Sequence, residues 1–267
     1  MNKSLPSYFS VGDGPAVILL HCTLSSKNQW RALASLLQGS HRVIALDLYG
    51  YGDTPMPSVA AADFTLADEA ELVRALADEL LPGERFQLVG HSYGGATALC
   101  FSRLFPERVT GVTAFEPVSF HLLPEGDPAL AGSRDFMQRM RDLVAAGKPQ
   151  DAVEAFVDYW GAPGTFAGFP ARVRNDFAAR AEKLVFDFHA ITGTPFTIDD
   201  YRELPMPVTV IAGRSSRPTA LRVAGLLADS VTTCRLLQVD TGHMGPVNDP
   251  ERVNPVIAES LSARLEG

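Results

Sequence analysis

One serine of the chain stands in a pattern that could make it a nucleophile. An apolar run at 86–89 leads into Gly90-His91-Ser92-Tyr93-Gly94-Gly95, and an apolar helical pattern follows. In such a strand–turn–helix the serine sits in a sharp turn that lifts its hydroxyl clear of the sheet. Glycine suits positions 90 and 94 because neighbouring backbone would crowd a side chain there. We therefore expect Ser92 to be a nucleophile; the alternative is a tight turn with a capping serine.

A histidine near the end of the chain could act as the general base. His243 lies in the segment Asp240–Pro246, directly after the last apolar run. A loop at the carboxyl end of a strand can bring an imidazole to the nucleophile, where it takes up the serine proton. The other histidines precede strands, flank the serine turn or fall in the middle of the chain. The alternative for His243 is a loop residue that caps the final helix.

The apolar pattern predicts the elements that would position these residues. Short, nearly continuous apolar runs alternate with longer amphipathic stretches, as in a parallel sheet covered by helices on both faces. The expected strands are Ala16–His21, Arg42–Leu46, Phe86–Val89, Val109–Phe115, Val208–Ala212 and Cys234–Val239. The expected helices are Gln29–Leu37, Leu66–Leu81, Tyr93–Phe105, Thr219–Leu227 and Pro250–Leu265. The predicted fold class is α/β, with a mostly parallel central sheet flanked by helices.

The middle of the chain interrupts this alternation. From about Leu122 to Leu204 no strand pattern is found, and amphipathic runs occur at Arg134–Ala146, Gln150–Trp160 and Ala171–His189. This pattern indicates a helical lid inserted before the penultimate strand. We expect residues 1–121 and 205–267 to form the core and residues 122–204 the lid, whose many aromatic side chains pack mostly on one another.

Composition narrows the choice of partners. The 267 residues include 23 Lys+Arg and 31 Asp+Glu, giving a formal net charge of -8. Without a basic patch, neither nucleic acid nor an anionic membrane is an expected partner. The three cysteines form no CxxC pair, so neither a disulfide framework nor a zinc site is predicted. The apolar run at 16–20 is too short for a signal or a membrane span, so a cytoplasmic protein is expected.

Several segments together resemble the α/β-hydrolase superfamily, over nearly the whole chain from about Pro15 to Leu265. They are Gly90–Gly95, His243, His21-Cys22-Thr23 and the Asp47–Gly52 segment, which is similar to the D-x-x-G-x-G loop of that superfamily. The resemblance is specific for the fold and the nucleophile and unspecific for the substrate.

The resemblance also implies an acid for the triad. In most members the acid follows the strand after the lid, but here that strand runs into Gly213–Pro218, which holds no carboxylate. A minority, including some haloalkane dehalogenases, place the acid after the strand before the lid, where this chain has Glu116. Glu116 would then orient His243 and stabilise its imidazolium. The open alternatives are Asp240, a dyad without an acid, and a Glu116 that only lines the pocket.

The family pattern further implies an oxyanion hole made by the backbone N–H groups of Tyr93 and Thr23. Each such donor can be worth roughly 3 kcal/mol to the transition state. Most members have His-Gly where this chain has His21-Cys22. Because a Cβ restricts the backbone, the donor from this loop is the less certain of the two.

Together these features predict a serine hydrolase. It would cleave a carboxylic ester, thioester or lactone with a hydrophobic portion through an acyl-enzyme, without a metal or organic cofactor. The serine at position 92 argues against haloalkane dehalogenase and epoxide hydrolase chemistry, which needs an aspartate there. Two alternatives stay open: a C–C bond hydrolase or lyase on the same triad, and a slow-turnover ligand-binding or receptor protein on a hydrolase scaffold. The sequence does not indicate an oligomeric state.

Overall fold

A central parallel sheet organises the chain, as expected. The computed structural model describes residues 5–262, and its strands pair in the order β1-β3-β2-β4-β5-β6-β7. All neighbours are parallel except β1 and β3. The strands are β1 (Tyr8–Val11), β2 (Ala16–Leu20), β3 (Arg42–Leu46), β4 (Phe86–His91), β5 (Val109–Phe115), β6 (Val208–Gly213) and β7 (Cys234–Val239). The predicted fold class is confirmed, and each predicted run forms a strand within two residues of its expected ends.

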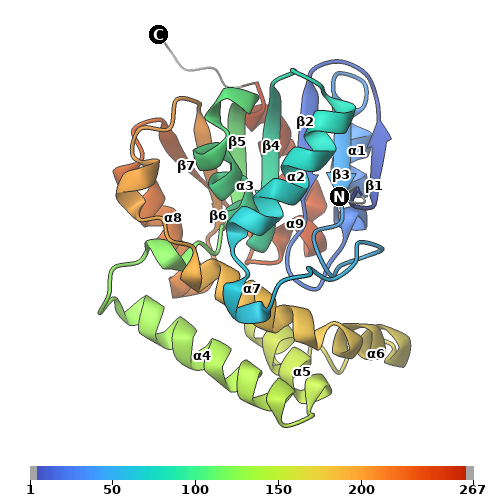
Figure 1. The fold of residues 1–267 in the computed structure, drawn as a ribbon, viewed down its shortest axis with the longest axis vertical. Helices are drawn as coiled ribbons and strands as arrows, with labels where there is room; N and C mark the ends of the chain where they lie inside the picture. Colours follow the sequence, from blue (N-terminus) through green and yellow to red (C-terminus); the bar gives the residue numbers. More distant parts are fainter. Residues whose placement is uncertain (1–4, 263–267) are drawn as a thin grey trace.

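Helices cover both faces of this sheet (Figure 1). Along β2, Ile18 and Leu20 belong to one buried core, and Val17 and Leu19 belong to the other. This alternation is what the period of two in a strand requires. The first core also contains α2 (Leu66–Leu80), α3 (Tyr93–Leu104) and α8 (Pro218–Ser230), and the second contains α1 (Arg31–Leu37) and α10 (Pro250–Ser260).

Both edge strands differ from the sequence prediction. β1 was not predicted, because its side chains alternate between exposed and half-buried positions and give no continuous apolar run. β7 was predicted to be buried on both faces, but most of its side chains are exposed or half-buried. An edge strand has one neighbour and less cover, so its sequence pattern is weaker than that of a central strand.

Four helices lie between β5 and β6 in the sequence. They are α4 (Pro128–Ala145), α5 (Pro149–Trp160), α6 (Ala171–Ala179) and α7 (Ala181–Gly193). Figure 1 shows them gathered beyond one end of the sheet, with α7 running between this group and the core. The arrangement is that of a cover over the sheet end. Treating residues 122–204 as a separate lid stays a prediction.

The amphipathic run at Ala171–His189 forms two helices, α6 and α7, rather than one. The helix is interrupted at Arg180, which has φ -100 and ψ 5, and α7 begins at the next residue. The sequence around the break contains neither glycine nor proline, so no local signal marks it. The interruption matters because α7, which begins after it, carries the buried side chains of Lys183 and Asp187.

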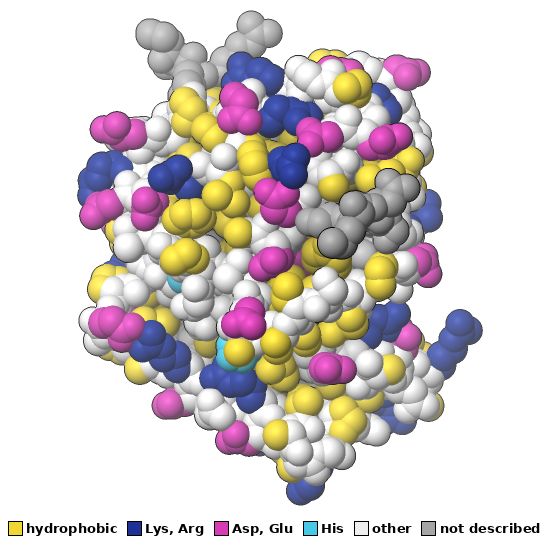
Figure 2. All heavy atoms as spheres, viewed as in Figure 1, with side chains coloured by type: hydrophobic (Ala, Val, Ile, Leu, Met, Phe, Trp, Pro, Cys, Tyr) yellow, Lys and Arg dark blue, Asp and Glu magenta, His cyan; other side chains and the backbone are white. Residues whose placement is uncertain are grey.

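Charged side chains of both signs lie on the visible face of the molecule (Figure 2). On the face shown in Figure 2, basic and acidic side chains are interspersed among apolar ones. Among residues 5–262, no helix combines the length and the apolar character that crossing a bilayer requires.

Buried histidines make the stability of this fold sensitive to acid. Burial lowers the pKa of His121 from 6.5 to about 4, and one ring nitrogen of this side chain lacks a hydrogen-bond partner among the described residues. Below pH 6.5 the unfolded chain binds a proton at this histidine that the folded chain does not, so acid favours unfolding.

We expect His121→Leu to weaken this pH dependence. Between pH 6.5 and pH 5, the free energy of unfolding should fall less steeply in the variant than in the wild type. The difference in slope should be on the order of 1 kcal/mol per pH unit. Urea unfolding at several pH values measures both slopes, and equal slopes would contradict the prediction.

Candidate active site

The turn after β4 holds Ser92 in a strained conformation. Its φ is 55 and its ψ is -112, a region that residues with a Cβ rarely adopt. The Ser92 amide donates to the Phe115 carbonyl at 2.9 Å, which fixes the turn to β5. A Cβ on Gly90 would lie 2.2 Å from the Gly94 carbonyl oxygen, and one on Gly94 would lie 2.3 Å from the Leu20 carbonyl oxygen. The crowding expected from the sequence is therefore present at both glycines.

His243 bridges the serine and a carboxylate. Its Nε2 lies 3.0 Å from Ser92 Oγ, and its Nδ1 lies 2.6 Å from Glu116 Oε2. All three side chains are buried. An Nδ1–H that donates to the carboxylate leaves Nε2 as the acceptor for the serine hydroxyl, which is the tautomer a general base needs.

The end of β6 and the loop that follows it hold the Glu116 carboxylate in place. Glu116 follows β5 with φ 44, and its Oε1 accepts hydrogen bonds from the Gly213 amide at 2.6 Å and from the Ser216 hydroxyl. The segment in which most relatives are expected to carry an acid thus contributes two donors to Glu116. The alternative acid, Asp240, is mostly exposed and its nearest charged partner is Arg252, at 4.0 Å.

A neutral hydrogen-bond chain lies behind the base. Gln29 Oε1 accepts from the Cys22 amide at 3.1 Å, so its Nε2 donates to His91 Nδ1 at 3.1 Å. His91 Nε2 must then carry the proton and donate to the His243 carbonyl at 2.9 Å. Burial holds the pKa of His91 well below 6.5, so the ring stays neutral. This chain joins the loop after β2 to the loop of the base.

Two cavities meet at the nucleophile. We call them the inner and the outer cavity, and both are lined by Thr23, Ser92, Phe156 and Trp160. The inner cavity is also lined by Phe120, Ser133, Phe136, Met137, Asp187, Phe188 and Ile191. The outer cavity is also lined by Leu24, Ser25, Phe169, Phe177, His243, Met244 and Val247. The Trp160 ring lies over the His243 ring, with 4.1 Å between centroids.

The residues expected to form an oxyanion hole lie beside Ser92. Among the described residues, the amides of Thr23 and Tyr93 have no hydrogen-bond acceptor. Tyr93 begins α3, so its amide is one of the free N–H groups of that helix start. Thr23 precedes Leu24, whose φ of 57 turns the loop sharply. That these two amides bind a substrate oxygen stays a prediction.

Sequence reasoning missed the residues that support this site from a distance. Gln29, His91 and Asp187 are separated by up to about 160 positions from their partners. Only His91 falls within a motif, at a position of the serine turn where any residue is allowed. His91 was treated only as a neighbour of the nucleophile. The one available signal was a polar Gln29 next to the buried Trp30, in a predicted helix that covers the core.

Comparison with known proteins agrees with this architecture. Fluoroacetate dehalogenase from Burkholderia sp. is 25% identical over an alignment of 280 positions, which covers 96% of this chain and 90% of that protein. A cis-3-alkyl-4-alkyloxetan-2-one decarboxylase from Shewanella oneidensis is 31% identical over 121 residues, which span 45% of this chain and 38% of the relative. The enol-lactonase from Burkholderia xenovorans LB400 has a TM-score of 0.78 at 18% identity, covering 96% of each chain.

A family described as the alpha/beta hydrolase fold matches residues 15–250, most of the chain. This match agrees with the sheet order and with the nucleophile turn between β4 and α3. The chain therefore belongs to the α/β-hydrolase fold family.

Proposed function

We propose that the protein is a serine hydrolase that cleaves a carboxylic ester, thioester or lactone through an acyl-enzyme. The observation that carries the proposal is the hydrogen-bonded series Ser92 Oγ–His243 Nε2 and His243 Nδ1–Glu116 Oε2. A nucleophile, a base and a group that orients the base are the parts this chemistry needs.

The proposed reaction has two stages. His243 takes the Ser92 proton while Ser92 Oγ attacks the carbonyl carbon, and Glu116 stabilises the imidazolium that forms. The negative oxygen of the tetrahedral intermediate accepts from the amides of Thr23 and Tyr93. His243 then protonates the leaving oxygen or sulfur, and the acyl group stays on Ser92. Water, deprotonated by His243, attacks the acyl-enzyme and releases the acid.

The two cavities suggest where each half of the substrate binds. The leaving group must lie next to His243, which protonates it. Because His243 lines the outer cavity but not the inner one, we assign the leaving group to the outer cavity and the acyl group to the inner one. Aromatic and aliphatic side chains line most of the inner cavity, which favours an acyl group with a hydrophobic portion.

The charges around the cavities favour a neutral acyl group. Neither cavity is lined by a lysine or arginine among the described residues, and the inner one presents the carboxylate of Asp187. Lys183 already pairs with Asp187, so a substrate that carries its own carboxylate would find no lysine or arginine lining either cavity to pair with. Fluoroacetate, for which the similar dehalogenase is named, is an anion and does not match this lining.

A short-chain nitrophenyl ester tests the proposal. We expect the wild type to hydrolyse it and Ser92→Ala to lose the activity. A fluorophosphonate probe that labels Ser92 in a protein without esterase turnover would instead favour a ligand-binding role. Cleavage of a carbon–carbon bond next to a ketone, in the absence of ester hydrolysis, would favour the C–C hydrolase alternative.

Glu116→Gln should reduce kcat at least about tenfold, because an amide N–H facing His243 Nδ1 favours the wrong tautomer. Asp240→Asn is the matched control, since this carboxylate is mostly exposed and does not touch His243. Steady-state kinetics of the three proteins decide between the two acids. Loss of activity in Asp240→Asn alone would overturn the assignment of Glu116.

Ser133→Phe should shorten the acyl chains that the protein accepts. The Ser133 hydroxyl bonds only to the Ala129 carbonyl of its own helix, so the substitution breaks no contact across the lid and fills the inner cavity. We expect kcat/KM for an octanoyl ester to fall at least about tenfold further than for an acetyl ester, since each buried methylene contributes about 0.8 kcal/mol.

Val247→Phe, at the outer cavity, provides the comparison for this test. It should change the dependence on the alcohol and leave the acyl dependence as it is. The reverse pattern would exchange the two cavity assignments.

A further inference from the structure

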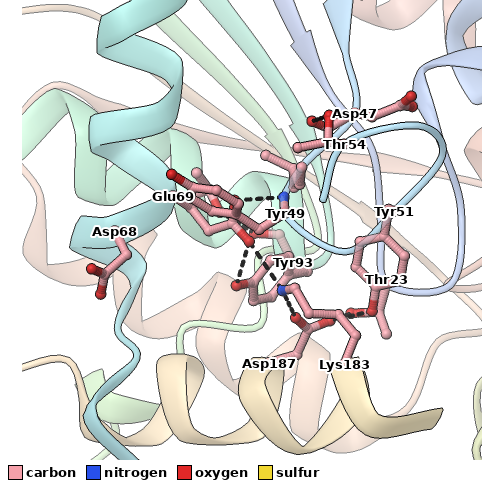
Figure 3. Close-up of polar contacts among 12 residues, drawn as sticks. Thr23, Asp47, Tyr49, Tyr51, Thr54, Asp68, Glu69, Tyr93, Lys183 and Asp187 are labelled. Atoms are coloured by element: carbon pink, nitrogen blue, oxygen red, sulfur yellow. Dashed lines mark hydrogen bonds and ion pairs between the residues drawn. The ribbon is translucent and has the colours of Figure 1, made fainter. Parts of the chain in front are cut away.

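A buried ion cluster lies where α7 meets the core. We use this term for Lys183 and Asp187 of α7 and Glu69 of α2, all of which are almost completely buried. Lys183 Nζ donates to Glu69 Oε1 at 3.0 Å and also to Asp187 Oδ1. Figure 3 shows the lysine reaching from α7 between the two carboxylates.

The two carboxylates of the cluster each hold one residue of the proposed oxyanion hole. The Thr23 hydroxyl donates to Asp187 Oδ2 at 2.7 Å, and the Tyr93 hydroxyl donates to Glu69 Oε1 at 3.1 Å. These contacts are drawn in Figure 3. The two residues with free amides beside Ser92 are therefore anchored, through their side chains, to carboxylates that share one lysine.

The single positive charge of Lys183 offsets part of the negative charge of the two carboxylates. Burial alone would lower the pKa of Lys183, but the charges of Asp187 and Glu69 outweigh it and raise that pKa. The lysine also lies 4.8 Å from the ring centroid of Phe64 and 4.9 Å from that of Tyr93, where an ammonium group is stabilised. Breaking such a pair by removing one partner is costly, because it leaves an uncompensated buried charge.

We propose that this cluster positions the oxyanion hole and makes its geometry depend on the seating of α7 on the core. Glu69 belongs to the core, whereas Lys183 and Asp187 arrive with α7. Only when α7 packs on the core can the Thr23 hydroxyl reach Asp187. The same packing brings Lys183 to Glu69, which accepts from the Tyr93 hydroxyl. The inference rests on the proposed hydrolase function, because an oxyanion hole has a role only in that chemistry.

Lys183 has a second effect in this arrangement. Asp187 lines the inner cavity next to Thr23, and a bare carboxylate there would disfavour the negative charge that develops on the substrate oxygen. The lysine compensates that charge while leaving Asp187 free to accept from Thr23. Lys183, Asp187 and Glu69 thus act as positioning residues, through the two amide-bearing residues, and touch no reacting atom.

Thr23→Val tests the anchor with little change in volume. The variant keeps the backbone N–H of residue 23 and loses the hydroxyl that donates to Asp187. We expect kcat to fall about tenfold with KM changed less than about twofold, because the contact matters in the transition state. Thr23→Ser, which restores the hydroxyl, should recover most of this loss.

An alkylboronic acid provides a readout that a purely structural role would not change. Ser92 Oγ adds to its boron, the serine proton passes to His243, and the tetrahedral adduct is negatively charged like the intermediate. Its affinity for Thr23→Val should fall by the same factor as kcat/KM, while the affinity of the alcohol product stays constant. Equal losses for both ligands would show a general disturbance of the cavity and overturn the proposal.

Asp187→Asn tests the carboxylate itself, with a matched control in another ion pair. Arg222 of α8 pairs with Asp127 at the start of α4, at 2.9 Å, and touches neither Thr23 nor Tyr93. We expect Asp187→Asn to lower kcat and boronate affinity together, and Arg222→Gln to leave both unchanged. Equal effects of the two variants would mean that only the seating of the helices matters, and would refute the proposal.

The outcomes separate this inference from the proposed function. If the wild type hydrolyses esters but Thr23→Val and Asp187→Asn match it in kcat, the inference is wrong and the proposed function stands. If the wild type neither hydrolyses esters nor binds the boronic acid, the proposed function is wrong and the inference falls with it. Melting temperatures identify any variant that fails to fold. If Asp187→Asn is such a variant, Thr23→Val still tests the inference, because Thr23 lies at a half-buried loop position.

Discussion

The hydrogen bond from the Ser92 amide to the Phe115 carbonyl is the contact on which the geometry of this site depends. It holds the strained turn after β4 against the end of β5, one residue before Glu116. The Glu116 amide in turn donates to Ile211 of β6, and the amide of Gly213 donates back to the Glu116 carboxylate. Neighbouring parallel strands thus bring the serine and the carboxylate to one edge of the sheet, where the loop after β7 adds the histidine.

The sequence predicts those parts of the site that follow from local patterns. Strand β4, the crowding at Gly90 and Gly94, and the start of α3 are all determined within about 15 residues of Ser92. Glu116 could be proposed only from the resemblance, because nothing local explains why a carboxylate there would meet His243. The explanation is the pair of donors from Gly213 and Ser216, which are far away in sequence and carry no motif.

Contacts between distant segments account for what the sequence could not predict. Lys183 meets Glu69 across 114 positions, and Thr23 meets Asp187 across 164. Each charged residue, taken alone, is typical of the exposed face of an amphipathic helix. Only the break at Arg180 and the packing of α7 on the core turn Lys183 and Asp187 inward.

The two supporting systems of the site differ in charge, and the chemistry explains why. In the proposed mechanism His243 gains and loses a proton in each cycle, and Glu116 already supplies the charge that stabilises its protonated form. A second fixed charge behind the ring would bias one of the two states. The chain of Gln29 and His91 that holds its backbone is accordingly neutral, since burial keeps His91 unprotonated.

On the other side of Ser92, the proposed oxyanion hole would keep its N–H donors throughout the cycle and would exchange no proton. Charged partners can therefore anchor it without disturbing a titration, provided that their charges compensate. Lys183 offsets one of the two carboxylate charges, and burial raises the pKa of Glu69, which favours its neutral form. The proposed serine hydrolase chemistry therefore accounts for both supports: the group that titrates has a neutral one, and the groups that do not titrate have an ionic one.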